Sequence, residues 1–290
     1  VYPRARRFYR QSQERYDVVI DEINTVPFMT PKFVNRGEKV IALIHQLARE
    51  FWFFEMPYPA AWLGYHVLED RWLKRYRDIT TITVSDSTRN ELLELGFTDI
   101  SVVHNGLNVT PLDSIPSKSR VPSMAFVGRM KKAKKPDDVV KAYRMLKERH
   151  PKLQLTMIGD GYCREQLKAE NPDIEFTGYI SREKRDELVK QSWVIAVPGV
   201  REGWGQVVTD ANALGTPAVG YDIPGLRDSI KNGKNGLLVR PDPASMARAI
   251  DALLSDELMR DSLTAGALTW SKSFDWDKSA RWFEEIIMKP

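Results

Sequence analysis

Residues 193–215 constrain the fold most, because a strand-like run, a glycine-containing turn and a helix-like run follow one another there directly. The apolar run 193–197 precedes a turn that holds Gly203 and Gly205. Apolar residues then recur at helical spacing, namely Val207, Val208, Ala211 and Leu214. This order predicts a parallel α/β sheet, in which the turn lies between the carboxyl end of a strand and the N-terminus of a helix.

The turn before this helix has the polar groups that a nucleotide sugar requires. The first amides of a helix lack intrahelical partners and lie at the positive end of the helix dipole, so they attract a phosphate. Gly203 and Gly205 have no side chains and let the backbone approach a ligand closely. Glu202 would repel a phosphate, but a carboxylate is a pure acceptor and suits hydroxyl groups. Amides for phosphate and a carboxylate for hydroxyls together indicate a nucleotide sugar.

The composition sets the class of protein. The chain has 290 residues, of which 42% are hydrophobic and 28% charged, as is typical of a globular protein with two domains. No apolar run approaches the roughly 18 residues of a membrane span and no signal peptide is visible, so we expect a cytoplasmic protein, with peripheral membrane contact as an addition. Cys163 is the only cysteine, which excludes an intrachain disulfide and a thiolate metal cluster. The net charge of +4 suits an anionic ligand or an acidic membrane surface and does not require nucleic acid.

Residues 121–270 alternate strand-like and helix-like segments with short connections, which predicts a doubly wound parallel sheet. We expect its strands at 124–127, 153–158, 174–177, 193–197, 217–220 and 235–239. Several strands end in glycine-containing turns, which are Gly128-Arg129, Gly159-Asp160-Gly161 and Gly178-Tyr179-Ile180. Helices are expected from Pro136, at 181–190, after Gly205 and at 243–270.

The first part of the chain shows a similar pattern, before a polar linker at 114–120. Its strands are expected at 16–21, 39–44, 80–84 and 100–103, and its helices at 68–76 and from the cap Ser85 to about Leu95. His45 follows the second of these strands. Ligands of a parallel sheet lie at the carboxyl ends of its strands, so His45 is a candidate site residue, and a capped histidine at a strand end is the alternative.

Two further segments allow two interpretations each. Residues 1–16 carry five arginines among aromatic residues and predict a basic amphipathic helix, which either packs on a sheet as an ordinary surface helix or is attracted to anionic lipid headgroups. Residues 51–65 are strongly aromatic, and Pro57 and Pro59 predict a loop there. We expect these aromatic residues to pack in the core, with an exposed acceptor groove or lipid interface as the alternative.

The run E-G-W-G-Q-V-V-T-D-A-N-A-L-G-T-P-A-V at 202–219 resembles the E-x7-E motif of the family 4 retaining glycosyltransferases, which have the GT-B fold. Glu202 matches the first glutamate, whereas Asp210 stands at the position of the second and is one methylene shorter. The resemblance implies that Glu202 contacts hydroxyls of the donor sugar and that Asp210 contacts the nucleotide ribose. It also places the intervening residues Gly203, Trp204, Gly205, Gln206 and Val207 at the donor.

Other turns match the same family. The run after Gly128 is similar to G-R-x4-K, which implies that Arg129 and Lys134 grip the donor diphosphate as negative charge grows on it. Neighbouring lysines in this run are expected to form a solvated face. Gly161 matches an I-G-x-G turn, and the next turn implies that Tyr179 and Ile180 line the pocket of the base, with ordinary turn packing as the alternative. The resemblance also implies that His45 faces the donor sugar from the other domain.

The resemblance implies an α/β protein of GT-B type with two Rossmann-like domains that have parallel sheets. We expect an acceptor-side domain at 1–110, a nucleotide-sugar-binding domain at 111–275 and a terminal helix at 276–290 that crosses back. A complete first domain of this family opens with a strand and a glycine-rich loop, and neither is found here. We therefore expect a fragment, or a first domain whose opening βα units are missing, reduced or supplied by a partner chain.

The resemblance implies a glycosyltransferase of hexosyltransferase type that moves a sugar from a nucleotide diphosphate sugar to an acceptor with retention. Its catalytic residues would be Glu202, His45, Arg129 and Lys134. It would need no metal and no cofactor beyond the donor. One alternative is a GT-B nucleotide-sugar epimerase, against which the Glu202 motif argues. Another is a non-catalytic or partner-dependent fragment that binds a nucleotide sugar or a membrane, and only the basic charge favours a nucleic-acid module.

Overall fold

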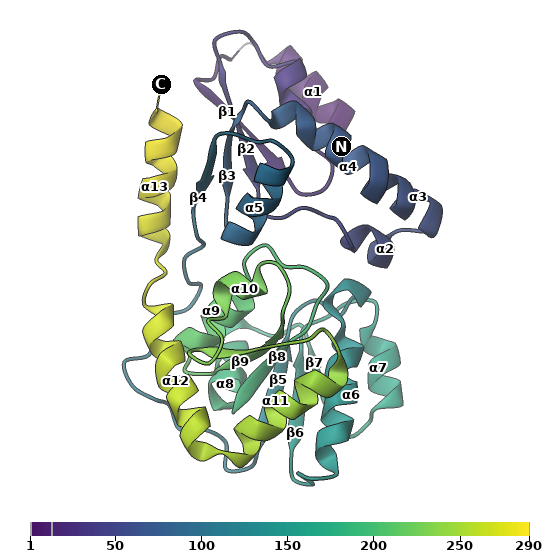
Figure 1. Cartoon of the computed structure of the whole chain (residues 1–290), viewed down its shortest axis with the longest axis vertical. Coiled ribbons are helices and arrows are strands. Elements are labelled where there is room, and N and C mark those ends of the chain that lie inside the picture. The colour runs from purple at the N-terminus through teal and green to yellow at the C-terminus, as the bar shows by residue number, and fades with distance from the viewer. Residues whose placement is uncertain (1, 13, 290) are drawn as a thin grey trace. The chain divides into compact units, whose positions relative to one another are not determined.

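The computed structural model describes residues 2–12 and 14–289 (Figure 1). Val1 and Gln13, which fall in the expected N-terminal helix, and Pro290, which ends the expected terminal segment, lie outside the described residues. Helices and parallel strands alternate along the chain, so the predicted α/β class is confirmed. Among the helices described, none is both long and apolar enough to cross a bilayer.

The chain divides into two compact units. Unit 1 comprises Val1–Asn105 and Trp276–Pro290, and unit 2 comprises Gly106–Asp275. The division falls after Asn105 and not at 110, because the turn that opens unit 2 is bonded within that unit. The backbone N–H and the side-chain amide of Asn108 both donate to the Asp210 carboxylate, at 2.9 and 3.1 Å.

The described part of unit 1 contains a four-stranded parallel sheet in the order β1-β2-β3-β4. Its strands are β1 (Val18–Ile23), β2 (Lys39–Ile44), β3 (Thr80–Thr83) and β4 (Ile100–Val102). Its helices are α1 (Tyr2–Gln11), α2 (Phe51–Glu55), α3 (Tyr58–Leu63), the π-helix η2 (Gly64–Leu68), α4 (Glu69–Leu73), α5 (Asp86–Glu94) and α13 (Trp276–Met288). Successive side chains of β2 point to opposite faces, so Ile41 packs with Ile286 of α13, whereas Ile44 packs with Leu92 of α5. Both faces of this sheet are therefore covered by a hydrophobic core.

Strand β1 runs to Ile23, two residues past the end predicted at Asp21. Asp21 can lie inside the sheet because its carboxylate, only 1% exposed, has hydrogen-bond partners. It accepts from the backbone N–H and the hydroxyl of Thr30, at 3.3 and 2.9 Å, and from the Tyr76 hydroxyl. Burial beside this carboxylate raises the pKa of Tyr76. These bonds fix the short 3-10 helix η1 (Thr30–Lys32) to the sheet.

Residues 51–55 and 58–65 are helical, whereas the sequence predicted a loop at 51–65. The helix predicted at 68–76 is present as the end of η2, α4 and the short 3-10 helix η3 (Lys74–Tyr76). Pro59 does not interrupt the segment, because it lies in the first turn of α3, where its missing N–H costs no hydrogen bond. The expectation of core packing is right for Trp52, which is buried. It is wrong for Tyr58 and Trp62, which are 71% and 47% exposed, because a short helix can turn only one side toward the sheet.

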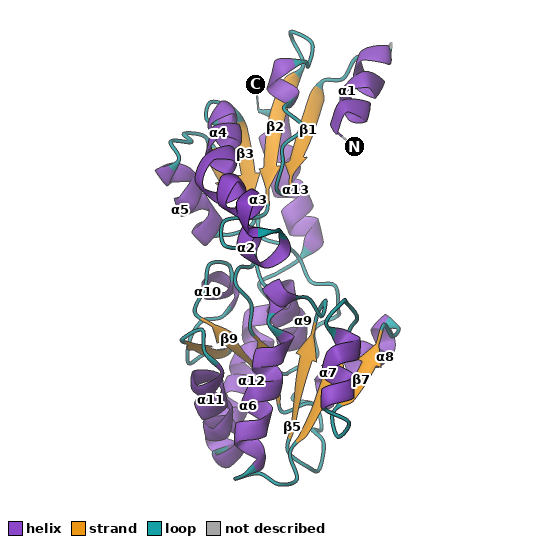
Figure 2. Cartoon of the chain, turned by 90° about the vertical axis from the view of Figure 1, so that its right-hand side faces the viewer, coloured by secondary structure: helices purple, strands orange, loops and turns teal. Residues whose placement is uncertain are grey.

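All residues of unit 2 are described, and they form a six-stranded parallel sheet in the order β10-β9-β8-β5-β6-β7. The strands are β5 (Ser123–Val127), β6 (Gln154–Ile158), β7 (Glu175–Gly178), β8 (Val194–Val197), β9 (Ala218–Tyr221) and β10 (Gly236–Val239). The helices are η4 (Lys132–Lys134), α6 (Pro136–Lys147), α7 (Arg164–Glu170), α8 (Arg182–Gln191), α9 (Gln206–Ala213), α10 (Leu226–Ser229), α11 (Pro243–Ser255) and α12 (Glu257–Ser271). Helices cover both faces, with α6 against α11 on one and α9 against α12 on the other (Figures 1 and 2). The predicted doubly wound sheet is confirmed.

Candidate active site

The carboxyl ends of β5 and β8 mark a reversal in the strand order of unit 2. The chain winds outward from β5 through β6 to β7 and then places β8 on the other side of β5. Ligands of parallel α/β sheets bind at such a reversal. The loops after these two strands, 128–135 and 198–205, hold most of the residues that the sequence assigns to a donor. They lie side by side, since the backbone N–H of Val200 donates to the Ala133 carbonyl at 3.0 Å.

Lys134 and Glu202 form an ion pair between the two loops. Their side chains are 24% and 17% exposed, so the pair is partly shielded from water and is stronger than a fully solvated surface pair. The sequence analysis assigned the cation to a diphosphate and the carboxylate to a sugar. The structure places these two charges on each other.

The backbone of Glu202 is held by the loop after β9, which the sequence analysis did not assign to the site. The N–H of Glu202 donates to the Pro224 carbonyl at 3.3 Å. Gly225 has φ 82°, and a Cβ there would stand 2.0 Å from the carbonyl oxygen of Glu202, so only glycine fits. A signal for this residue was present, because I-P-G-L at 223–226 follows an expected strand, as the other glycine turns of this unit do.

Helix α9 begins directly after this turn. Gly205 precedes it with φ 90° and ψ 47°, and no described side chain caps the helix. The first amides, those of Gln206 and Val207, therefore face the turn at the positive end of the helix dipole. Trp204 is different, because it is buried and its ring packs edge-on against Phe274, with 5.1 Å between centroids. Of Trp204, only the backbone remains for contact with a ligand.

Arg129 stands exposed in the loop after β5, and its guanidinium forms no ion pair with any described carboxylate. Two glycines let this loop lie against the loop after β6. The N–H of Gly128 donates to the Ile158 carbonyl at 3.0 Å, and a Cβ at Gly161 would stand 2.4 Å from the Met130 carbonyl. The structure therefore gives Gly161 a packing role, which positions the loop that carries Arg129.

Asp210 lies in α9 and is bonded within the protein. Besides the two bonds from Asn108, its Oδ1 accepts from the side-chain amide of Gln206 at 3.0 Å. The same Gln206 amide also donates to the Gly106 carbonyl at 2.8 Å. The contact of Asp210 with a ribose stays a prediction, and its link to Asn108 was missed because 102 residues separate the two in the sequence.

The remaining predicted residues lie in two places. Tyr179 follows β7 and is 91% exposed, so its ring is open to a ligand, whereas Ile180 is partly buried against the hydrophobic core of unit 2. His45 belongs to unit 1 and follows β2, where its Nε2 lies 3.6 Å from Glu22. It lines an apolar pocket of about 210 Å³, within that unit, together with Phe283. The role of His45 beside a donor sugar stays a prediction.

Comparison with known proteins gives the family. The profile described as glycosyl transferases group 1 matches residues 113–270, more than half of the chain, and the chain belongs to this family. An uncharacterized glycosyltransferase of Methanocaldococcus jannaschii is 28% identical over 240 residues, which cover 74% of this chain and 61% of that protein. The chain spans about half the length of other curated relatives that it matches.

Solved structures give the fold. Sucrose-phosphate synthase from Thermosynechococcus elongatus matches with a TM-score of 0.77 at 18% identity, covering 98% of this chain and 76% of that one. The pneumococcal O-GlcNAc transferase GtfA, solved in complex with UDP and GlcNAc, matches with a TM-score of 0.70 at 17% identity, covering 98% of this chain and 60% of that one. The expected GT-B fold with two parallel sheets is confirmed.

Proposed function

We propose that this chain carries the donor site of a family 4 retaining glycosyltransferase, which moves a sugar from a nucleoside diphosphate sugar to an acceptor. The ion pair between Lys134 and Glu202 carries this proposal, because it stands at the strand-order reversal beside the first amides of α9. A cation, a carboxylate and helix amides thus meet on adjoining loops. These groups match the diphosphate and the hydroxyls of such a donor.

Donor binding would exchange the partners of this ion pair. A diphosphate carries more negative charge than one carboxylate, so it competes successfully for Lys134 and also attracts the exposed Arg129. Glu202 is then released and accepts hydrogen bonds from sugar hydroxyls. Before a ligand with anionic and hydroxyl groups binds, each member of the pair neutralises the charge of the other. The UDP and GlcNAc bound to the pneumococcal neighbour support a donor of this kind.

In the transfer step, the bond between the anomeric carbon and the diphosphate oxygen breaks, and its electron pair goes to the diphosphate. The acceptor oxygen bonds to the anomeric carbon on the same face, and its proton passes to the departing diphosphate. Negative charge that grows on the diphosphate is stabilised by Arg129, Lys134 and the α9 amides. Because these groups supply the positive charge, the proposed reaction needs no metal ion and no cofactor beyond the donor.

The substitution Glu202→Gln tests the proposal, because it removes the charge and keeps the shape. A panel of UDP-, GDP- and ADP-sugars is first screened by calorimetry, and sugar release from the bound donor is then measured with and without acceptors. Loss of a charged hydrogen bond to the sugar predicts a roughly tenfold to hundredfold fall in turnover. Affinity for the free nucleoside diphosphate should rise a few-fold, since Lys134 no longer has a competing partner.

The matched control is Glu148→Gln, which removes one exposed carboxylate of the same unit outside the site. It should change neither quantity. Full turnover in Glu202→Gln contradicts the proposed role of the carboxylate. Nucleotide binding without any sugar release from native protein would instead identify a binding fragment.

A further inference from the structure

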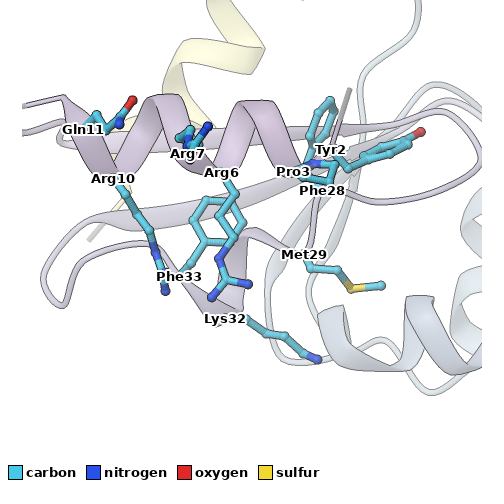
Figure 3. A pocket seen from close by; sticks show the side chains of 10 residues that line it. All are labelled: Tyr2, Pro3, Arg6, Arg7, Arg10, Gln11, Phe28, Met29, Lys32 and Phe33. Carbon is cyan, nitrogen blue, oxygen red and sulfur yellow. The ribbon is translucent and has the colours of Figure 1, made fainter.

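Unit 1 contains a hollow of about 650 Å³ between α1 and η1, far along the chain from the loops of the donor site. Cationic and aromatic side chains line it. The cations that matter here are Arg6, Arg10 and Lys32, and the aromatic residues are Tyr2, Phe28 and Phe33. Figure 3 shows Arg6 and Arg10 leaving α1 on the side of Phe33 and Lys32. Positive charge from two separate elements thus converges on one concave surface.

The helix is held in place by its tyrosines, so the arginines do not have to contribute to packing. The hydroxyl of Tyr9 donates to Glu38 and accepts from the backbone and side-chain amides of Asn35, at 3.0 and 2.9 Å. The rings of Tyr9 and Phe33 lie 5.6 Å apart, and those of Tyr2 and Phe28 lie 4.9 Å apart. Opposite, Asp21 fixes η1 to the sheet through Thr30. The hollow is therefore formed by two anchored elements.

The charges around the hollow are not neutralised by the chain itself. Helix α1 contains four arginines and no acidic residue. No described carboxylate forms an ion pair with Arg6, Arg10 or Lys32. Arg6 lies over the Phe33 ring, 5.6 Å from its centroid, which orients the guanidinium without reducing its charge. A cluster of cations without counterions favours the binding of an external anion.

The charge of α1 as a whole indicates what carries this anion. Arg4 and Arg7 are exposed beside Arg6 and Arg10, so the helix presents four cations and no acidic residue. A single free phosphate meets only part of this charge, whereas an anionic membrane surface meets all of it. A cluster of basic residues on one short helix is the pattern that binds anionic lipid headgroups.

We propose that α1 and η1 dock this protein on the surface of an anionic phospholipid membrane. The hollow takes a headgroup phosphate on Arg6, Arg10 and Lys32. This inference goes beyond the proposed transfer reaction and does not depend on it. It follows the second of the two interpretations of residues 1–16, because the helix packs through its tyrosines and still exposes its arginines.

Vesicle flotation of the full chain tests the inference. One set of vesicles contains phosphatidylcholine alone, and the other contains an equal mixture of phosphatidylcholine and phosphatidylglycerol. We expect flotation only with the anionic set, and a loss of binding as salt rises. Each cation near an anionic surface contributes roughly a fivefold gain in binding, so the triple variant Arg6→Gln, Arg10→Gln, Lys32→Gln should bind on the order of a hundredfold more weakly.

A second triple variant controls for net charge and for folding. Lys152→Gln, Lys168→Gln and Lys184→Gln remove three exposed cations of unit 2 and should leave flotation close to native. Circular dichroism melting confirms that both variants fold. Phe8→Ala should leave flotation and the melting temperature close to native, because the side chain is exposed and lies on the side of α1 away from Arg6 and Arg10.

Three results would overturn the inference. Equal flotation with both vesicle sets removes the electrostatic basis. Equal loss in the two triple variants shows that net charge and not this surface is responsible. Stabilisation by inorganic phosphate without any flotation identifies the hollow as a site for soluble phosphate and not for a membrane.

Discussion

Gly225→Ala is the sharpest test of how the donor site is built. Gly225 has φ 82° and ψ −44°, a conformation that residues with a side chain rarely adopt, and an added Cβ would lie 2.0 Å from the carbonyl oxygen and 2.5 Å from the carbonyl carbon of Glu202. Both of these atoms are backbone, so rotation of a side chain cannot relieve the overlap. Either the loop after β9 or the turn that carries Glu202 must move.

The size of the effect follows from a comparison with Gly233. Gly233 has φ 75°, close to the 82° of Gly225, but a Cβ there meets no described atom within 4 Å. Gly233→Ala should therefore cost only the left-handed strain, about 1–2 kcal/mol. Gly225→Ala should cost a further 1–3 kcal/mol from the overlap. The difference between the two variants therefore measures the overlap with Glu202 together with any strain from the ψ of −44° at Gly225.

Urea denaturation measures the stability of both variants, and calorimetry measures their binding of a nucleoside diphosphate. A displaced Glu202 should also lose its pairing with Lys134, so Gly225→Ala should lower sugar release more than its stability loss explains, while Gly233→Ala keeps native activity. If the two variants lose equal stability and both keep full activity, the contact does not position Glu202 and the reasoning is wrong.

Three other outcomes are expected. Arg129→Ala combined with Lys134→Ala should weaken nucleoside diphosphate binding at least tenfold by calorimetry, since each charged hydrogen bond contributes about 1.5–3 kcal/mol, and unchanged affinity contradicts the diphosphate assignment. Asp210→Asn should lower the melting temperature and weaken nucleotide binding, because the new side-chain amide cannot accept from both donors of Asn108. Asp210→Glu should keep nucleotide binding, and equal nucleotide affinity of the two variants in calorimetry would argue against a contact of Asp210 with the ribose. Burial lowers the pKa of Lys118 from 10.5 to about 7, so the unfolded chain binds more protons between these values and stability rises with pH there. Lys118→Met should flatten this rise in urea midpoints between pH 7 and 9, and equal slopes would refute it.

Most of the fold could be predicted because its signals are local. The strands of unit 2 are apolar runs that end at glycines, and β2 was placed at its observed bounds of Lys39–Ile44. The caps of α5 and α8 were also predicted, and the side chains of Ser85 and Ser181 do accept from the first turns of these helices. Such features depend on residues within one or two turns of each other, which a sequence shows directly.

The errors come from interactions between distant segments. The sequence predicts that β1 ends at the charged Asp21, and the strand continues because Thr30 and Tyr76 donate hydrogen bonds to this carboxylate. The sequence also predicts that Pro59 interrupts a helix, and it does not because it lies in the first turn of α3.

The candidate site follows the same division. The residue types of the site and the strands that they follow could be predicted from the sequence, because glycines, cations and a carboxylate follow consecutive strands. The ion pair between Lys134 and Glu202 could not be predicted, because 68 residues separate them and each had a plausible role with a ligand. The packing of Trp204 against Phe274 was hidden for the same reason.

Residues 202–210 contact both segments that connect unit 2 to unit 1. The chain leaves unit 1 after Asn105 and returns to it at Trp276. Near the first passage, Gln206 and Asp210 hold Gly106 and Asn108, and near the second, Trp204 packs on Phe274. One short stretch therefore clamps both connections at their unit 2 ends. We expect a ligand bound to this stretch to stiffen both connections at once, and by reciprocity a strain on either connection should change the affinity for that ligand.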